Sequence, residues 1–154
     1  MKPDLGELGL VRPPLVYLAS LATGAVLEFA MPFPFLRGTL NAALGAGVVV
    51  LAIALFAYSV AKFHAAGTPV PARKPTTAIV RTGPYRVSRN PIYLAFSLVQ
   101  LGIAVWANSL WLLATLVVAV SVINFLVIPR EERYLEQKFG AEYLHYKADV
   151  RRWF

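Results

Sequence analysis

Four long apolar stretches, separated by shorter polar segments, dominate the pattern of the chain. They run over residues 14–30, 40–61, 92–107 and 109–128. A helix rises about 1.5 Å per residue, so each stretch reaches or approaches the roughly 30 Å of hydrocarbon in a bilayer. A soluble helix hairpin would explain one such pair, but not four stretches in so short a chain. The pattern predicts an all-α integral membrane bundle of about four transmembrane helices, followed by a C-terminal interfacial helical segment.

Composition supports a membrane protein and excludes several kinds of functional site. Of 154 residues, 58% are hydrophobic and 15% charged, against about 45–50% and about 25% in soluble domains. The length suits a single domain, residues 1–154. The absence of cysteine excludes disulfides, thiolate metal sites and a cysteine nucleophile. His64 and His145 are the only histidines, so we expect no metal centre.

The net charge of +7 is distributed unevenly along the chain. The amino-terminal segment, the connection after the second stretch and the C-terminal tail together carry fourteen of the fifteen basic residues, and only Arg37 lies on the other side. The positive-inside rule makes the basic side cytoplasmic, so we expect both termini there. Because these charges flank apolar spans, we assign them to topology and to anionic headgroups, and expect no nucleic-acid partner.

The polar connection over residues 62–91 predicts a rigid loop that leads into a helix. Its prolines and glycines exclude a long helix; they are Pro69, Pro71, Pro75, Pro84, Gly67 and Gly83. Asn90 is expected as the N-cap of the next helix and Pro91 as its first residue. A helix amino terminus with Arg86 and Arg89 nearby suits a carboxylate or phosphate. The alternative is a loop that binds headgroups non-specifically.

Some polar residues lie within the apolar stretches. Tyr93, Ser97 and Gln100 share one helical face. Asn124 shares a face with Glu131 and Glu132 if the last helix continues past Pro129. These groups either frame a pocket that opens to the cytoplasmic side or hold the bundle together by hydrogen bonds. For Ser97 and Ser121 we favour hydrogen bonding within the bundle, whereas for Gln100 and Asn124 both interpretations stand.

The C-terminal segment predicts a helix that leaves the membrane and ends at Gly140, then a second short helix over residues 141–148. Glu131 and Glu132 fall where the last span meets the headgroups. A low dielectric and anionic lipid disfavour carboxylates there, unless an arginine or a cationic or hydroxyl-bearing ligand compensates them. Pairing with Arg86, Arg89 or Arg133 is the purely structural alternative.

Three segments together resemble a known family. They are Thr82-Gly83-Pro84-Tyr85-Arg86-Val87-Ser88-Arg89-Asn90-Pro91-Ile92-Tyr93-Leu94, Arg130-Glu131-Glu132-Arg133-Tyr134-Leu135 and Phe139-Gly140-Ala141-Glu142-Tyr143-Leu144-His145-Tyr146. Their order and spacing resemble the isoprenylcysteine carboxyl methyltransferases and the phospholipid (phosphatidylethanolamine) N-methyltransferases. The resemblance covers residues 64–154. It implies a helical membrane enzyme that holds S-adenosylmethionine on the cytoplasmic side with its last hairpin and tail.

The resemblance also implies roles for individual residues. Arg89, Asn90, Pro91 and Tyr93 would wrap the cofactor and Glu131 would contact it. Glu132 with Arg130, the catalytic candidates, would support the cofactor or face the acceptor. Tyr143 and Tyr146 would close the pocket, with Gln100 and Asn124 as further cofactor-binding candidates.

Two positions depart from the family pattern. Asn90 stands where the family often has histidine, and it cannot act as a base near neutral pH. Ala95 stands where the family often has glycine, which would restrict a close approach of a helix or ligand.

The predicted function is methyl transfer to a membrane-embedded acceptor, either a prenylcysteine-like carboxylate or a lipid amine. A carboxylate acceptor needs no base, whereas an amine must lose a proton that a glutamate can help to accept. Two alternatives stand beside it: an NADPH-dependent membrane reductase of the sterol-reductase type and a non-catalytic membrane subunit.

Overall fold

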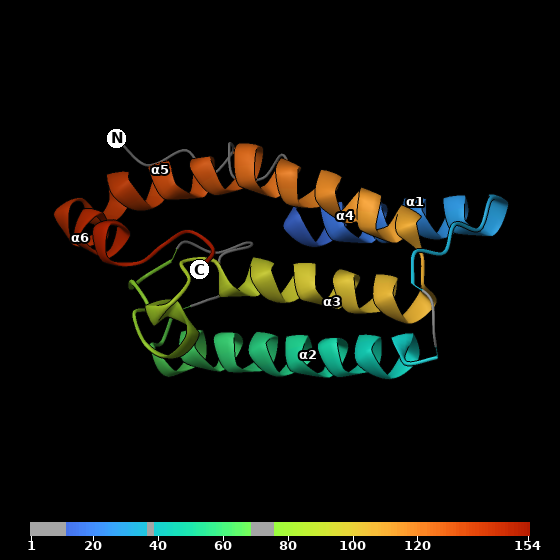
Figure 1. Ribbon diagram of the computed structural model, residues 1–154. Coiled ribbons are helices and arrows are strands. Elements are labelled where there is room, and N and C mark those ends of the chain that lie inside the picture. Colours follow the sequence, from blue (N-terminus) through green and yellow to red (C-terminus); the bar gives the residue numbers. More distant parts are fainter. Residues whose placement is uncertain (1–11, 37–38, 69–75) are drawn as a thin grey trace.

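The computed structural model describes residues 12–36, 39–68 and 76–154. All the secondary-structure elements within these ranges are helices (Figure 1). In chain order these are α1 (Pro13–Ala30), α2 (Asn41–Ala65), the short 3₁₀ turn η2 (Gly83–Arg86), α3 (Pro91–Ala107), α4 (Leu110–Val122), the π-helical turn η3 (Ile123–Val127), α5 (Ile128–Phe139) and α6 (Ala141–Asp149). Successive long helices run in opposite directions, and α4, η3 and α5 form one continuous rod. The predicted all-α class is confirmed.

Three of these helices are long and apolar enough to cross a membrane: Pro13–Ala30, Asn41–Ala65 and Leu110–Phe139. The fourth, α3, is apolar but shorter, at 17 residues. A helix of this length rises about 25 Å, near the lower limit for a span. The structure therefore agrees with an α-helical membrane bundle whose third helix is the short one, as its apolar stretch predicts.

Small residues let α2 and α3 pack closely. A Cβ atom added at Gly45 would lie 2.5 Å from the backbone oxygen of Gly102 and 2.4 Å from the backbone nitrogen of Trp106. Ala52 and Ala95 are also fully buried. Small side chains favour such close contacts because lipid provides no hydrophobic force between helices. This contact joins the start of α2 to the end of α3, and the antiparallel packing of the two helices brings the end of α2 beside the start of α3, where the pocket described below lies.

At the opposite end of the bundle, polar groups bind the two connections together. The Asn108 side-chain oxygen accepts hydrogen bonds from the backbone nitrogens of Phe35 and Leu36, at 3.1 and 2.7 Å. Ser109 caps α4 by accepting from the Leu112 nitrogen and donates to the Glu28 carboxylate at 2.7 Å. The polar side chains at this end, Glu28 among them, thus hold the two connections together.

The last helix changes character at Pro129. Proline has no N–H to donate to the preceding turn, and the backbone widens into η3 directly before it. The apolar part, residues 110–128, rises about 28 Å and suffices to cross the hydrocarbon. Six charged residues follow within α5, so α5 lies outside the membrane-spanning segment. The helix continues past Pro129, and Gly140, with φ of 54°, ends it before α6.

Some sequence-based expectations concern residues outside the described ranges. Pro69, Pro71 and Pro75 of the expected rigid loop are among them, as are the charges of Lys2, Arg37, Arg73 and Lys74. Within the described part of the loop, Gly83 has φ of 62° and Pro84 lies in the η2 turn. This agrees with the turn expected there.

Candidate functional site

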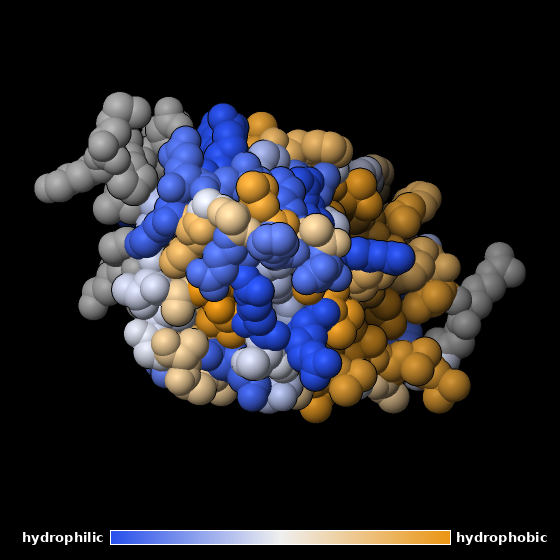
Figure 2. Space-filling model, turned by 90° about the vertical axis from the view of Figure 1, so that its left-hand side faces the viewer, coloured by the Kyte–Doolittle hydropathy of each residue, from blue (hydrophilic) through white to orange (hydrophobic). Residues whose placement is uncertain are grey.

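The candidate site lies at the end of the bundle where α2 ends, α3 begins, and α5, α6 and the C-terminal tail meet. Figure 2 looks onto this end and shows hydrophilic side chains gathered there, with hydrophobic side chains along one flank. The polar connection and the polar tail, remote in the sequence, thus meet on one face of the molecule.

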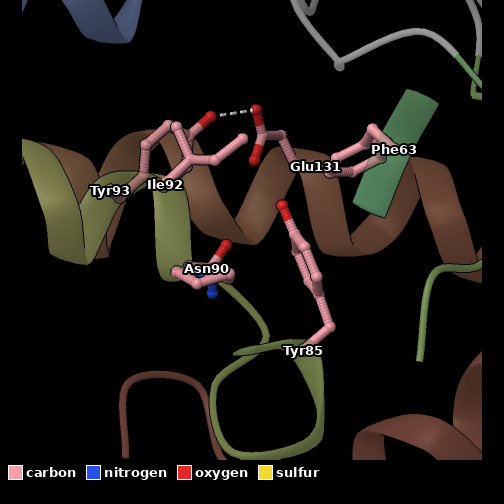
Figure 3. Close-up of a pocket in the computed structure, with 7 residues that line it drawn as sticks. Phe63, Tyr85, Asn90, Ile92, Tyr93 and Glu131 are labelled. Atoms are coloured by element: carbon pink, nitrogen blue, oxygen red, sulfur yellow. Dashed lines mark hydrogen bonds between the residues drawn. The ribbon is translucent and has the colours of Figure 1, made fainter. Parts of the chain in front are cut away.

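A small pocket of about 70 Å³ opens between these elements (Figure 3). Its lining comes from α2, the connection after it, the start of α3, and α5: Phe63, Tyr85, Asn90, Pro91, Ile92, Tyr93 and Glu131. Glu131 is the only formally charged residue in this lining. The pocket has room for a small group.

Glu131 faces α3, where the Tyr93 hydroxyl donates a hydrogen bond to it at 2.5 Å (Figure 3). Burial raises the pKa of the Glu131 carboxyl to about 7; the nearby charge of Glu132 adds to this rise, while the Tyr93 hydrogen bond opposes it. Glu131 is therefore poised to change charge near neutral pH, a property typical of acid–base and ligand-binding groups.

Tyr85 lies across the pocket from Glu131, and its hydroxyl points toward that carboxylate in Figure 3. The ring meets Phe63 edge-on at 5.2 Å, and the Tyr85 backbone oxygen accepts a hydrogen bond from Tyr146 at 2.8 Å. The Tyr85 hydroxyl is buried and has no hydrogen-bond partner among the described residues. Burial raises its pKa above the ordinary value, so it stays protonated.

Glu132 points instead into a cluster of basic side chains. Its carboxylate lies 3.2 Å from Arg89, 2.9 Å from Arg152 and 3.4 Å from Lys147. Burial alone would raise the pKa of Glu132, but the hydrogen bond from Arg152 and the nearby positive charges outweigh it and hold the pKa below its ordinary value. Glu132 is thus ionised and firmly paired.

The partners of Glu132 correct part of the sequence-based alternative. Arg89 was among the three expected, but Arg86 and Arg133 form no ion pair with either glutamate within the described ranges. Arg152 and Lys147 take their places. The guanidinium of Arg89 also keeps two buried donors, Nε and Nη1, without an acceptor in the part of the chain that the structure describes.

The C-terminal tail, residues 150–154, closes one side of the site. It lies along residues 88–90: the Arg89 nitrogen donates to the Arg151 oxygen at 3.0 Å. The Asn90 side chain donates to the Arg152 oxygen, also at 3.0 Å, rather than capping α3. Asn90 occupies the expected N-cap position, and its side-chain nitrogen binds the tail. The predicted N-cap position and helix start are confirmed, although the Asn90 side chain makes no capping hydrogen bond to α3.

Asn124 also holds the tail. It lies in η3, and its side-chain oxygen accepts hydrogen bonds from Trp153 at 3.0 Å and Arg152 at 3.4 Å. Asn124 therefore makes hydrogen bonds within the chain, next to the site, and does not line the pocket.

The remaining candidates fall into two groups. Tyr143 and Tyr146 of α6 are buried, and their rings lie 6.2 Å apart beside the pocket residue Tyr85 and the cluster. Gln100 is two turns along α3 from Tyr93, and its amide donates to Ser20 at 2.6 Å and to groups on α4. It does not line the pocket. The Arg130 side chain forms no ion pair or hydrogen bond within the described ranges.

Several site residues escaped sequence reasoning: Phe63, Tyr85, Lys147, Arg152 and Trp153. Tyr85 lies in the first segment of the family resemblance, but nothing in the sequence distinguishes a tyrosine that lines a pocket from one that packs in the core. The basic and aromatic residues at the end of the chain predict an interfacial segment, because nothing in the local sequence reveals their partners Glu132 and Asn124.

Fold and site together define a class: a helical membrane protein with a small pocket at the hydrophilic end of its bundle. The model of the phospholipid methyltransferase family matches residues 40–142, which is more than half of the chain. The protein belongs to this family. An uncharacterized protein of Haemophilus influenzae is 48% identical over 64 residues, which cover 40% of this chain and 98% of that protein. No solved structure matches the chain. Among the described residues, no group of three or more His, Cys, Asp or Glu side chains could hold a metal ion.

Proposed function

We propose that this protein transfers a methyl group from S-adenosylmethionine to the headgroup of a membrane-embedded acceptor, a lipid amine or a prenylcysteine-like carboxylate. One observation carries the proposal. The motif that begins α3 and the glutamate pair of α5, forty residues apart in the sequence, meet at a single pocket and its adjoining ion cluster. Membership of the phospholipid methyltransferase family supports the reaction class.

The side chains fit the chemistry of the proposed donor. Its amino-acid end carries a carboxylate, for which the two unpaired donors of Arg89 are suited. Its sulfonium and ribose hydroxyls suit the Glu131 carboxylate. When bound, S-adenosylmethionine would supply an electrophilic methyl group, which passes to the acceptor in line with the breaking carbon–sulfur bond and leaves a neutral thioether. Tyr143 and Tyr146 are proposed to cover the nucleoside side of the site, and Asn90 and Pro91 to contribute backbone contacts.

The chain's own contribution is positioning and charge. Glu132 orients Arg89 through their 3.2 Å ion pair, and Tyr93 orients Glu131. Rigid placement of reacting groups, with water excluded, can account for much of such a rate enhancement. For an amine acceptor, Glu131 can also accept the proton, since its pKa of about 7 suits a base at neutral pH. Arg130, outside the cluster, is proposed to face the acceptor's headgroup.

We propose that the site end of the bundle faces the cytoplasm. The basic residues gathered in the connection and tail support this orientation. The acceptor would then enter from the cytoplasmic leaflet, with its apolar tail in lipid and its headgroup in the pocket.

Calorimetric titration of the purified protein with S-adenosylhomocysteine, with NADPH as the comparison, tests the reaction class. Binding of S-adenosylhomocysteine alone supports the methyltransferase. Binding of NADPH alone would assign the protein to the reductases, and binding of neither to folded protein would favour a non-catalytic subunit. Transfer of labelled methyl from S-adenosylmethionine to vesicles of defined lipids or to a prenylcysteine then identifies the acceptor.

A further inference from the structure

The Tyr85 hydroxyl is a buried polar group for which the fold provides no partner. The residue is 4% exposed, and its hydroxyl has no hydrogen bond within the described ranges. The rest of the side chain is well fixed, with the ring against Phe63 and Val80 and the backbone oxygen bound by Tyr146. Poor packing of the residue therefore does not explain why its hydroxyl has no partner.

Three of the four other buried tyrosines among the described residues behave differently. The hydroxyls of Tyr17, Tyr93 and Tyr146 each have a hydrogen-bond partner, at 2.8, 2.5 and 2.8 Å. Burying an unsatisfied hydroxyl destabilises a fold, and phenylalanine would fill the same space without this penalty. A purely structural role thus does not account for the hydroxyl of Tyr85. Unsatisfied groups of this kind are typical of sites that a ligand completes.

The surroundings of the hydroxyl indicate what such a ligand carries. Figure 3 shows it pointing across the pocket toward Glu131, with the Phe63 ring beside it. No lysine, arginine or histidine lines the pocket, which offers oxygen atoms and aromatic rings around one carboxylate. Aromatic rings and carboxylates attract cations, and methylated cations in particular. The volume of about 70 Å³ suits a compact group.

We propose that Tyr85 is a ligand-binding residue whose hydroxyl oxygen, opposite Glu131, binds the small cationic centre of a ligand. This inference rests on the proposed function for the identity of that ligand. The cation is either the sulfonium of the methyl donor or the ammonium group of the acceptor. In both cases the phenolic oxygen faces the positive charge, so Tyr85 orients the reacting group.

The first test uses small cations and does not depend on the cofactor. The full-length protein in detergent is titrated with tetramethylammonium chloride, and then with sodium chloride at equal ionic strength, while the unfolding midpoint is recorded. We expect a saturable rise with tetramethylammonium alone, and a rise that is lost or shifted about tenfold in concentration in Tyr85→Phe. Tyr134→Phe, which removes a hydroxyl that contacts Lys138 outside the pocket, is the matched control. Equal responses of wild type and Tyr85→Phe would overturn the proposal.

The second test identifies the source of the cation. If it is the sulfonium, Tyr85→Phe weakens binding of S-adenosylmethionine about tenfold but that of the neutral S-adenosylhomocysteine much less. If it is the ammonium, both cofactor affinities stay the same and the KM for the amine acceptor rises about tenfold. No change in any of these quantities overturns the assignment of Tyr85. Wild type that responds to tetramethylammonium but binds neither cofactor contradicts the proposed function instead.

The unliganded stability separates the binding role from a structural one. Because Tyr85→Phe removes an unsatisfied buried hydroxyl, we expect an unfolding midpoint equal to or above that of wild type. A large fall in the midpoint, with the cation response unchanged, would mean that the hydroxyl has an internal structural role, and would overturn the proposal.

Discussion

The two sides of α5 hold neighbouring carboxylates in opposite surroundings. Glu131 faces the pocket, with one tyrosine as its hydrogen-bond partner and a pKa raised to about 7 by burial. Glu132 faces the cluster, where Arg89, Lys147 and Arg152 surround it. Adjacent residues on a helix point about 100° apart, so one short segment serves both regions. The difference indicates that the cluster side holds the structure, while the pocket side is left available for a ligand.

The largest expected effect is on the cluster side. Glu132→Gln leaves Arg89, Lys147 and Arg152 without their shared counter-charge, and Arg89 is buried there. Breaking a buried ion pair by removing one partner costs about 3–5 kcal/mol. We expect a loss of about 3 kcal/mol in the free energy of unfolding, measured by denaturation in a mild detergent.

Glu136→Gln is the matched control for this variant. Glu136 is half-buried and pairs with Lys147 at 2.7 Å, on the edge of the same cluster. A pair of this exposure contributes under about 1 kcal/mol. Equal stability losses in Glu132→Gln and Glu136→Gln would contradict the structural role assigned to Glu132.

The pocket side should respond in activity rather than in stability. Glu131→Gln keeps the size of the side chain and an oxygen that can accept from Tyr93, but it removes the negative charge. We expect methyl transfer to fall about 100-fold, the range for loss of an acid–base group. The unfolding midpoint should stay within a few degrees of wild type. A stability loss as large as that of Glu132→Gln would show that the two sides do not differ in role.

Titration of Glu131 sharpens the same contrast. Its pKa is raised from 4.5 to about 7, so its contribution to stability is present below pH 4.5 and is lost as the pH rises through 7. Cation binding has the opposite trend, because the ligand needs the carboxylate. Between pH 6 and 8 we expect the affinity for tetramethylammonium to rise about tenfold. In Glu131→Gln this dependence should vanish; an unchanged pH profile would assign it to another group.

The helices of the bundle could be predicted from the sequence, because a membrane span is determined by the length of an apolar run. The end of the last helix was harder to predict. A proline commonly ends a helix, whereas Pro129 lies within the continuous rod of α4, η3 and α5. The opposite roles of Glu131 and Glu132 could not be predicted. They depend on which neighbours each meets, and the strongest partner, Arg152, is twenty residues away.

The contacts of the C-terminal tail could not be predicted from the sequence either. Its aromatic and basic residues predict an interfacial segment, and that local pattern is real. Its partners, however, are the backbone of Arg89 and the side chains of Asn90 and Asn124. Contacts over more than sixty residues follow no helical or alternating period, so periodicity cannot reveal them. The resemblance to a family identified Arg89, Asn90, Tyr93 and the glutamates, but not the tail that holds them.

The smallest expected effect concerns how the tail supports the cluster side. Trp153→Phe removes the 3.0 Å hydrogen bond to Asn124 and keeps most of the ring's packing. A single neutral hydrogen bond contributes about 1 kcal/mol, so hydrogen exchange at the Arg89 amide, which donates to the Arg151 oxygen, should accelerate about fivefold. Trp106→Phe, at the exposed far end of α3, should leave this rate unchanged. If Trp153→Phe also leaves it unchanged, the ion pair of Arg152 with Glu132 alone anchors the tail, and η3 does not support the cluster.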